Sequence, residues 1–136
     1  EKNKQLFSDM GVLTPSECEA REVVLLEHYA GTVDIECRAM VDMIRRHVIP
    51  SAKSAGVGTV AELEAEAARL EKALAEVHSA ASPQEAACLA RTLRLETMDE
   101  SRKVCDATEL LVPPAMWTLA SYKELLFLDT HRNRLC

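Results

Sequence analysis

The sequence contains little glycine, little proline and few aromatic residues. Its 136 residues include four Gly, five Pro, two Phe, two Tyr and one Trp. An all-β fold needs many turns, so this scarcity of Gly and Pro argues against one. A core with so few rings must be built from Leu, Val, Ala and Met. Ala, Leu, Glu, Arg and Lys dominate instead, and because these residues form helices readily, the composition predicts an all-α fold.

The chain also lacks an excess of positive charge and a long apolar run. Its formal net charge of -6 argues against binding to nucleic acid, whose phosphates attract a basic face. The longest apolar candidate, residues 110–119, contains Pro113 and Pro114 and falls short of the roughly 20 residues of a membrane helix. The opening Glu-Lys-Asn-Lys shows no targeting segment. We expect a soluble protein of the cytoplasm or of an organelle stroma or matrix, without a membrane span or a nucleic-acid partner.

The cysteines do not suggest a disulfide framework. They are odd in number and form no C-x-x-C pair: Cys18, Cys37, Cys88, Cys105 and Cys136. Four of them lie inside helical patterns, where a free Cys acts as a small core residue. We therefore expect reduced thiols in a reducing compartment.

Three helix starts share one pattern, a hydroxyl residue followed three positions later by Glu. The pattern occurs at Thr14, Thr59 and Ser82. The hydroxyl can accept from the free N–H groups of the first turn, while the Glu can reach back to the cap. We expect three capping boxes, each opening a helix.

The apolar spacing predicts three long helices. The first runs over residues 15–55 and is kinked or interrupted at Pro50, which cannot donate a backbone hydrogen bond. The second runs over about 60–80, and its apolar residues form a coiled-coil-like seam: Val60, Leu63, Ala67, Leu70, Leu74 and Val77. The third runs over about 83–112, with Cys88, Leu93, Leu95, Leu110 and Leu111 among its apolar positions. Short connections predict an antiparallel hairpin.

These helices are expected to form one domain over residues 1–127. A short terminal helix falls within residues 115–127, and residues 128–136 read as a polar tail. The expected architecture is therefore a long kinked helix, an antiparallel helical hairpin and a short C-terminal helix.

The residues show no catalytic or metal-binding pattern. The glycines of Gly56-Val57-Gly58-Thr59 lack the strand, the spacing and the Lys of a phosphate-binding loop. The histidines, His28, His47, His78 and His131, have no metal-ligand spacing. Arg102 could lower the pKa of the neighbouring Cys105 thiol, although a Cys on an apolar stripe is more often a core residue. We expect no catalytic, cofactor or metal site in this segment.

One charged cluster favours a structural role. Arg102, Asp106 and Glu109 are spaced i, i+4 and i+7, so they share one helix face and can pair. We interpret them as a structural or interdomain contact rather than as catalytic residues.

The last third of the chain resembles the C-terminus of type III glutamine synthetases. Met98, Arg102, Asp106 and Glu109 follow the pattern M-x-x-x-R-x-x-x-D-x-x-E, before Trp117, Tyr122 and the ending Leu125-Leu126-Phe127. A second block is similar to the start of the same region: Leu6-Phe7, Gly11-Val12 and Thr14, then Glu27-x-Tyr29, 32–36 and 49–52. The two blocks stand in the family's order, so the resemblance spans residues 2–127.

The turn after the third helix departs from this family. The usual W-P-x-P-x-Y reads Trp117-Thr118-Leu119-Ala120-Ser121-Tyr122, so both prolines are replaced. Loss of two fixed φ angles should loosen the turn.

The resemblance implies a packing role rather than chemistry. Glutamine synthetases join glutamate and ammonia with ATP and Mg or Mn, and their ligands lie in domains that this sequence does not contain. The first hypothesis is therefore a non-catalytic C-terminal helical domain that contributes to assembly of an oligomeric, ATP-dependent glutamate–ammonia ligase. The alternative is a stand-alone helical interaction or scaffold subunit without enzymatic activity. In both, the candidate structural or interface residues are Arg102, Asp106, Glu109, Trp117, Tyr122 and Phe127.

Overall fold

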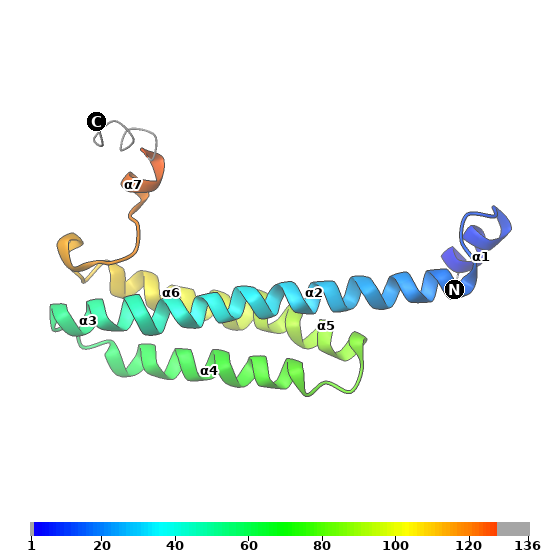
Figure 1. Ribbon diagram of the computed structural model, residues 1–136. Coiled ribbons are helices and arrows are strands. Elements are labelled where there is room, and N and C mark those ends of the chain that lie inside the picture. Colours follow the sequence, from blue (N-terminus) through cyan, green and yellow to red (C-terminus); the bar gives the residue numbers. More distant parts are fainter. Residues whose placement is uncertain (1, 128–136) are drawn as a thin grey trace.

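The computed structural model describes residues 2–127, apart from the side chains of residues 122 and 123, and within that range the chain is helical without a strand. The all-α prediction is confirmed, whereas the polar tail predicted at 128–136 lies outside the described residues. The elements are shown in Figure 1: α1 (Lys2–Asp9), α2 (Pro15–Met43), η1 (Ile44–Val48), α3 (Ile49–Ala55), α4 (Val60–His78), α5 (Pro83–Thr92), η2 (Leu93–Thr97), α6 (Met98–Glu109), η3 (Pro114–Met116) and α7 (Tyr122–Leu126).

The first long helix passes Pro50 without a break. Together α2, η1 and α3 form one helix of 41 residues, as the sequence predicts. Just before the proline the chain forms a π turn, in which the Ile49 N–H donates to the Ile44 carbonyl five residues earlier. Proline lacks an N–H and its ring presses on the preceding turn, and the wider π turn accommodates both effects. The expected kink or interruption is thus replaced by a local change of helix type.

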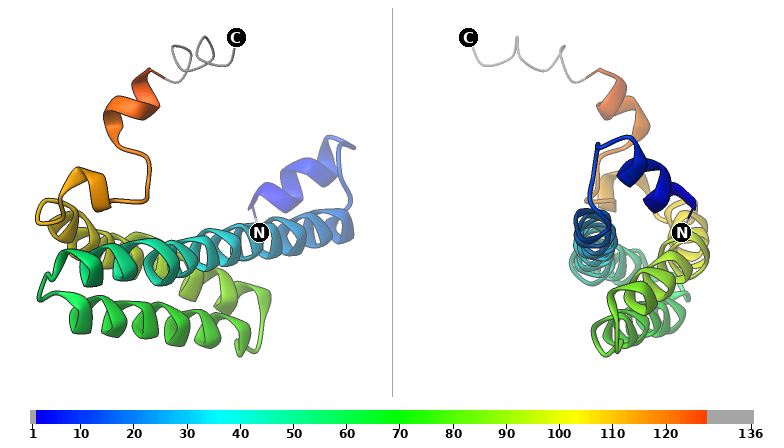
Figure 2. Two further views of the ribbon diagram at one scale, coloured as in Figure 1. Left: turned by 60° about the vertical axis from the view of Figure 1, so that its left-hand side comes forward. Right: turned by 90° about the vertical axis from the view of Figure 1, so that its right-hand side faces the viewer.

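The second and third helices pack beside the first as an antiparallel hairpin (Figures 1 and 2). The helix α4 ends at His78 and the α5–η2–α6 helix ends at Glu109, slightly earlier than predicted. The predicted seam faces the core, because five of its six residues are at most 7% exposed and Val60 is partly buried. They meet Val33, Cys37, Ile44 and Val48 of the first helix and Ala90 and Leu93 of the third.

The third helix buries only part of its predicted apolar stripe: Leu93 belongs to the core, and Leu89, Met98, Val104 and Cys105 pack against it. Leu95, Leu110 and Leu111 are 55%, 87% and 60% exposed, and Cys88 is also exposed. In the turn η2 the Met98 N–H donates to the Leu93 carbonyl five residues earlier. On the same helix two hydroxyl residues, Ser101 and Thr108, are fully buried.

Two of the three predicted caps form. Thr14 makes a full capping box: its hydroxyl accepts from the Glu17 N–H at 3.3 Å, and its own N–H donates to the Glu17 carboxylate at 2.7 Å. The Ser82 hydroxyl accepts from the Glu85 N–H at 3.2 Å, but the Glu85 carboxylate accepts from the Ala81 N–H instead of closing the box.

The helix predicted after Thr59 begins at Val60, but the capping box predicted there does not form. The Thr59 hydroxyl makes no cap and instead accepts from the Thr108 hydroxyl at 3.0 Å, joining the start of α4 to the end of α6. A box that we did not predict forms at Ser121, whose N–H donates to the Glu124 carboxylate at 2.8 Å. Its Ser-x-x-Glu spacing is the signal that identified the other caps.

The first half of α2 extends beyond the bundle (Figure 1). No residue of α2 before Val33 is buried, and we call residues 15–28 the overhang. The helix α1, which the sequence analysis missed, packs against it through Lys4, whose ammonium lies 3.4 Å from Glu19 and 3.9 Å from Glu22. None of the described helices is both long and apolar enough to cross a bilayer.

Candidate functional site

A groove runs between the first and third long helices. It consists of two adjoining hollows, of about 440 and 320 Å³, which share Val48, Arg102, Cys105 and Leu119. The larger hollow is also lined by Glu36, Met40, Met43, Ile44, Arg94, Met98 and Asp99. The smaller is also lined by Asp106, Glu109, Trp117, Ala120 and Leu125. We call this surface the α2–α6 groove.

Four of the six predicted structural residues meet in the smaller hollow. Arg102, Asp106 and Glu109 lie along one face of α6, and Trp117 comes from the turn that follows. The Arg102 guanidinium lies 3.5 Å from the Asp106 carboxylate, and both side chains are exposed. Phe127, 53% exposed, follows α7 and is not among the lining residues. Tyr122 begins α7, and its side chain lies outside the described atoms.

The groove thiol is not activated. Burial raises the pKa of Cys105 to about 11, and the charge of Asp106 contributes in the same direction. The suggestion that Arg102 lowers this pKa is therefore wrong, because burial disfavours the thiolate. Cys37 is fully buried, and burial raises its pKa to about 11 as well.

The turn after α6 is anchored to the bundle. The Thr118 hydroxyl lies 3.0 Å from His47 Nδ1 and 3.4 Å from the Ser51 hydroxyl, both on the first long helix. Trp117 and Leu119 on either side pack against the core. Thr118 occupies the place of the first family proline, so its hydroxyl gives the turn contacts that a proline lacks. These contacts oppose the loosening expected from loss of the prolines.

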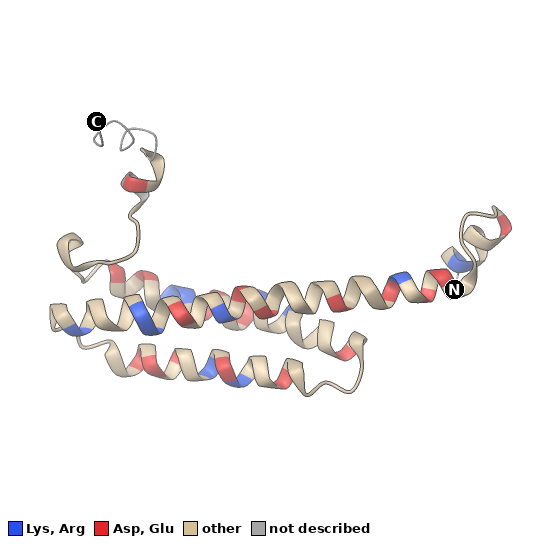
Figure 3. Cartoon of the chain, viewed as in Figure 1, with Lys and Arg blue, Asp and Glu red and all other residues tan. Residues whose placement is uncertain are grey.

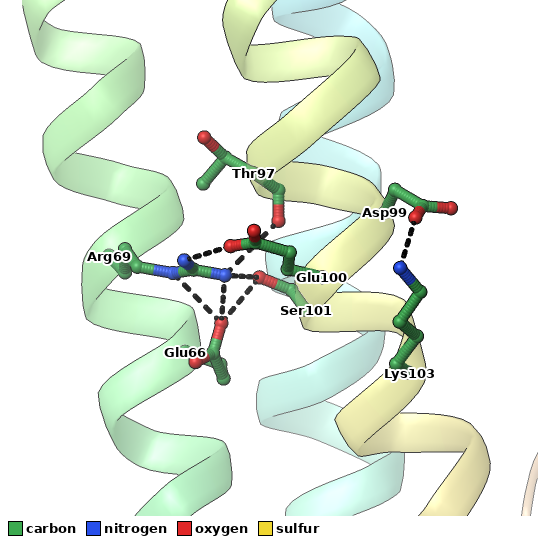
Figure 4. Close-up of polar contacts among 7 residues, drawn as sticks. All are labelled: Glu66, Arg69, Thr97, Asp99, Glu100, Ser101 and Lys103. Carbon is green, nitrogen blue, oxygen red and sulfur yellow. Dashed lines mark hydrogen bonds and ion pairs between the residues drawn. The ribbon is translucent and has the colours of Figure 1, made fainter.

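A polar network joins α4 to the third helix (Figure 4). The Arg69 guanidinium lies 2.8 Å from Glu66 on its own helix and 2.6 Å from Glu100 on α6. The fully buried Ser101 hydroxyl donates to the Glu66 carboxylate at 2.7 Å. Among the described residues no buried side-chain nitrogen or oxygen lacks a hydrogen bond. The network therefore satisfies the polar groups that the third helix buries.

A second polar contact pins α2 to α4. His78 Nε2 lies 2.7 Å from Asp34 Oδ1, and the Arg38 guanidinium binds the same carboxylate at 2.9 Å. The hydrogen bond from Arg38, supported by the one from His78, lowers the pKa of Asp34. Elsewhere acidic and basic residues are interspersed along the helices (Figure 3). No group of three potential metal-ligating His, Cys, Asp or Glu residues occurs in the described part of the chain.

The overhang and α1 expose apolar side chains. Val23, Val24 and Leu25 are consecutive on α2 and are 41%, 62% and 68% exposed. Around and before the turn into α2, exposed apolar residues continue with Leu6, Phe7, Met10 and Val12. Further along α2, Ile35 is exposed, whereas Met40 is partly buried and Ile44 belongs to the core.

Comparison with known proteins identifies the family. The sequence model of the family described as "Glutamine synthetase C-terminal domain" matches residues 1–71, about half of the chain. The chain is 37% identical over 51 residues to a type-3 glutamine synthetase of Dictyostelium discoideum, covering 38% of this chain and 7% of the relative. It is 27% identical over 151 residues to a glutamine synthetase of Butyrivibrio fibrisolvens, covering 90% of this chain and 22% of the relative. The chain belongs to the glutamine synthetase C-terminal domain family.

Proposed function

We propose that this segment is a non-catalytic packing and assembly domain of a type III glutamine synthetase-like protein. ATP-dependent ligation of glutamate and ammonia, with its ATP and its Mg or Mn, then belongs to an upstream domain. Family membership and the type-3 relative support this assignment. The matched segments cover only 7% and 22% of the two relatives' lengths, which fits a part that accompanies a larger body.

The apolar overhang is the observation that carries the proposal. Consecutive helical residues point in directions about 100° apart, so Val23, Val24 and Leu25 present apolar surface on most sides of α2. Exposed apolar patches of this kind mark contact surfaces. The overhang is therefore suited to packing against another domain or subunit.

The residues that carry the family resemblance also suit a structural role. Arg102, Asp106 and Glu109 line a groove beside Trp117, where the chain turns away from the third helix. Their side chains line the same hollow as Trp117 of this turn, and they match no catalytic motif of the family.

Substitution of the overhang tests the proposal. The double variant Val24→Gln and Leu25→Gln, made in the native protein, should weaken its assembly while the helix content stays unchanged. Size-exclusion chromatography with light scattering measures the assembly, and circular dichroism measures the helix content. Leu110→Gln is the control, because Leu110 is 87% exposed but follows the end of α6, outside the overhang. Unchanged assembly of the double variant would contradict the proposal.

The alternative is a stand-alone interaction or scaffold subunit. The replacement of both family prolines by Thr118 and Ala120 favours it, because the turn has diverged from the family pattern. The intact mass of the native polypeptide separates the two functions. A native species far above 15.0 kDa that contains a catalytic domain would exclude the stand-alone subunit. A native chain of this length would exclude ligase activity in the same polypeptide.

A further inference from the structure

Both π turns of the chain's described part border the larger hollow of the α2–α6 groove. Ile44 and Val48 belong to η1, and Arg94 belongs to η2. The π-helix accounts for well under 1% of residues in proteins, and single π turns are frequent at functional sites. Pro50 accounts for η1, but no proline lies in or just after η2. The irregular backbone is therefore concentrated at this groove.

The floor of this hollow consists of flexible, apolar side chains. Three of the chain's five methionines line it: Met40, Met43 and Met98. Ile44 and Val48 add branched apolar surface beside them. Methionine side chains are flexible and polarisable, so a surface of this kind adapts to apolar side chains of different shapes.

The groove continues lengthwise along the third helix. The two hollows meet at Val48, Arg102, Cys105 and Leu119, so the apolar floor extends from Met40 toward the turn at Trp117. An amphipathic helix binds such an elongated groove by inserting apolar residues spaced three and four apart.

The rim of the groove is acidic. The charged residues that line it are four acids and two arginines: Glu36, Asp99, Asp106, Glu109, Arg94 and Arg102. Arg94 is held by Glu36 at 3.1 Å and Arg102 by Asp106 at 3.5 Å, while Asp99 pairs at 2.7 Å with Lys103, which does not line the groove. Glu109 has no ion pair among the described residues. Three of the four acids are thus already paired, and a basic partner residue complements the charge of Glu109.

We propose that the α2–α6 groove binds the apolar face of an amphipathic helix from a partner protein, with basic residues flanking that face. The site is separate from the overhang and does not depend on the proposed assembly role. The apolar anchors enter the methionine-lined hollow, and the basic residues face Asp106 and Glu109.

Trp117 provides the measurement, because it is the only Trp of the chain and lines the groove. The probe is a Trp-free helical peptide of about 18 residues with a Leu face flanked by Lys. A matched peptide carries Glu in place of each Lys. Titration of the full chain with the Lys peptide should give a saturable change in Trp117 emission. The Glu peptide should bind about tenfold more weakly, or not at all.

Two substitutions locate the binding. Met43→Gln removes apolar surface from a 43% exposed groove residue and should weaken the Lys peptide about fivefold. Leu25→Gln, on the same helix but outside the groove, should leave affinity unchanged. The double variant Asp106→Asn and Glu109→Gln should narrow the difference between the two peptides, whereas Glu76→Gln on α4 should not. Circular dichroism confirms that each variant folds.

Three results would overturn the proposal. Equal affinity for the Lys and Glu peptides would show that the acidic rim does not contribute to peptide binding. Unchanged affinity in Met43→Gln would place the peptide elsewhere. An emission change produced by the small apolar anion anilinonaphthalene sulfonate, but by neither peptide, would assign the groove to small molecules instead of a helix.

Discussion

At the scale of single residues, position decides what a polar contact contributes. The Asp99–Lys103 pair on the surface of α6 is about as short as the Arg69 ion pairs, but both its side chains are more than half exposed. Such pairs contribute about 0–1 kcal/mol each. Ser101 is fully buried, and without Glu66 its hydroxyl would lose its acceptor in the core (Figure 4). Because an unsatisfied buried group costs about 1–3 kcal/mol, this contact fixes how α6 faces α4.

The Asp34 carboxylate gives a pH-dependent prediction. Its pKa lies below the ordinary value of 3.8 because Arg38, and then His78, bind the ionised form. The unfolded chain therefore takes up a proton before the folded one, and the stabilisation is fully present above about pH 4 and is lost as the pH falls through the lower folded value. We expect Asp34→Asn to reduce the free energy of unfolding by about 1 kcal/mol at pH 7.

Urea denaturation at several pH values measures this effect. The difference between wild type and Asp34→Asn should shrink below pH 4. Asp42→Asn serves as the control, because the Asp42 and Arg46 side chains lie 2.7 Å apart but are both exposed to solvent. A wild-type to Asp34→Asn difference that stays constant into acid would contradict the assigned cause.

At the scale of elements, residue spacing predicted the helices better than their orientation. The seam of α4 was predictable because Leu63, Ala67 and Leu70 keep one regular period. The buried face of the third helix was predictable only in part, because Leu93 and Met98 pack inward as their spacing indicates, but so do the hydroxyl residues Ser101 and Thr108. Thr59 had the spacing of a cap, but Thr108, distant in sequence, engages its hydroxyl. Local patterns cannot reveal such tertiary partners.

Two glycines should respond to alanine in opposite directions. Gly31 lies inside α2, and a Cβ built there meets no atom within 4 Å. Since glycine weakens a helix interior, Gly31→Ala should raise the free energy of unfolding by about 1 kcal/mol. Gly56 ends α3 with a φ of 70°, so Gly56→Ala should lower it by about 1 kcal/mol. Urea denaturation checks both predictions. A loss of stability in Gly31→Ala would contradict the first one, because it would mean that helix propensity does not determine the effect at this position.

The hairpin seam can be tested at its centre. Leu70 is fully buried, so Leu70→Asp places an unpaired charge in the core and should cost about 4 kcal/mol or more. Ala68→Asp puts the same side chain on the exposed side of α4 and should cost less than about 1 kcal/mol. Thermal melting followed by circular dichroism compares them. Equal melting temperatures for the two variants would refute the assigned pairing.

At the scale of the whole molecule, the chain divides into a packed helical bundle and the exposed overhang with α1. The sequence predicted that Arg102, Asp106 and Glu109 share a face, because helical spacing alone determines it. It did not predict the hollow that they line, because that depends on how Trp117 and Leu119 of the turn pack against the bundle. The methionines of the groove were likewise indistinguishable from core residues, since partial exposure follows only from packing.

Hydrogen exchange should separate the two parts of the long helix. The overhang has no buried residue, whereas from Val33 onward α2 packs against both other helices. Backbone amides of residues 19–28 should therefore exchange faster than those of residues 33–52, because they open without disrupting the core. Mass spectrometry of peptic fragments measures the rates in the isolated chain. Equal protection along the helix would contradict this division, and selective slowing of residues 19–28 in a native assembly would support docking there.

The unbroken path of α2 from overhang to bundle fixes their angular relation. The two share one helix axis, so each residue between Leu25 and Val33 sets a rotation of about 100° and a rise of about 1.5 Å. One alanine inserted there would turn the overhang and α1 by about 100° relative to the groove. Seven inserted alanines would move the overhang about 10 Å farther from the bundle, yet restore its direction to within about 20°. A partner that must contact both the overhang and the groove should therefore lose far more affinity from one inserted alanine than the small added length suggests.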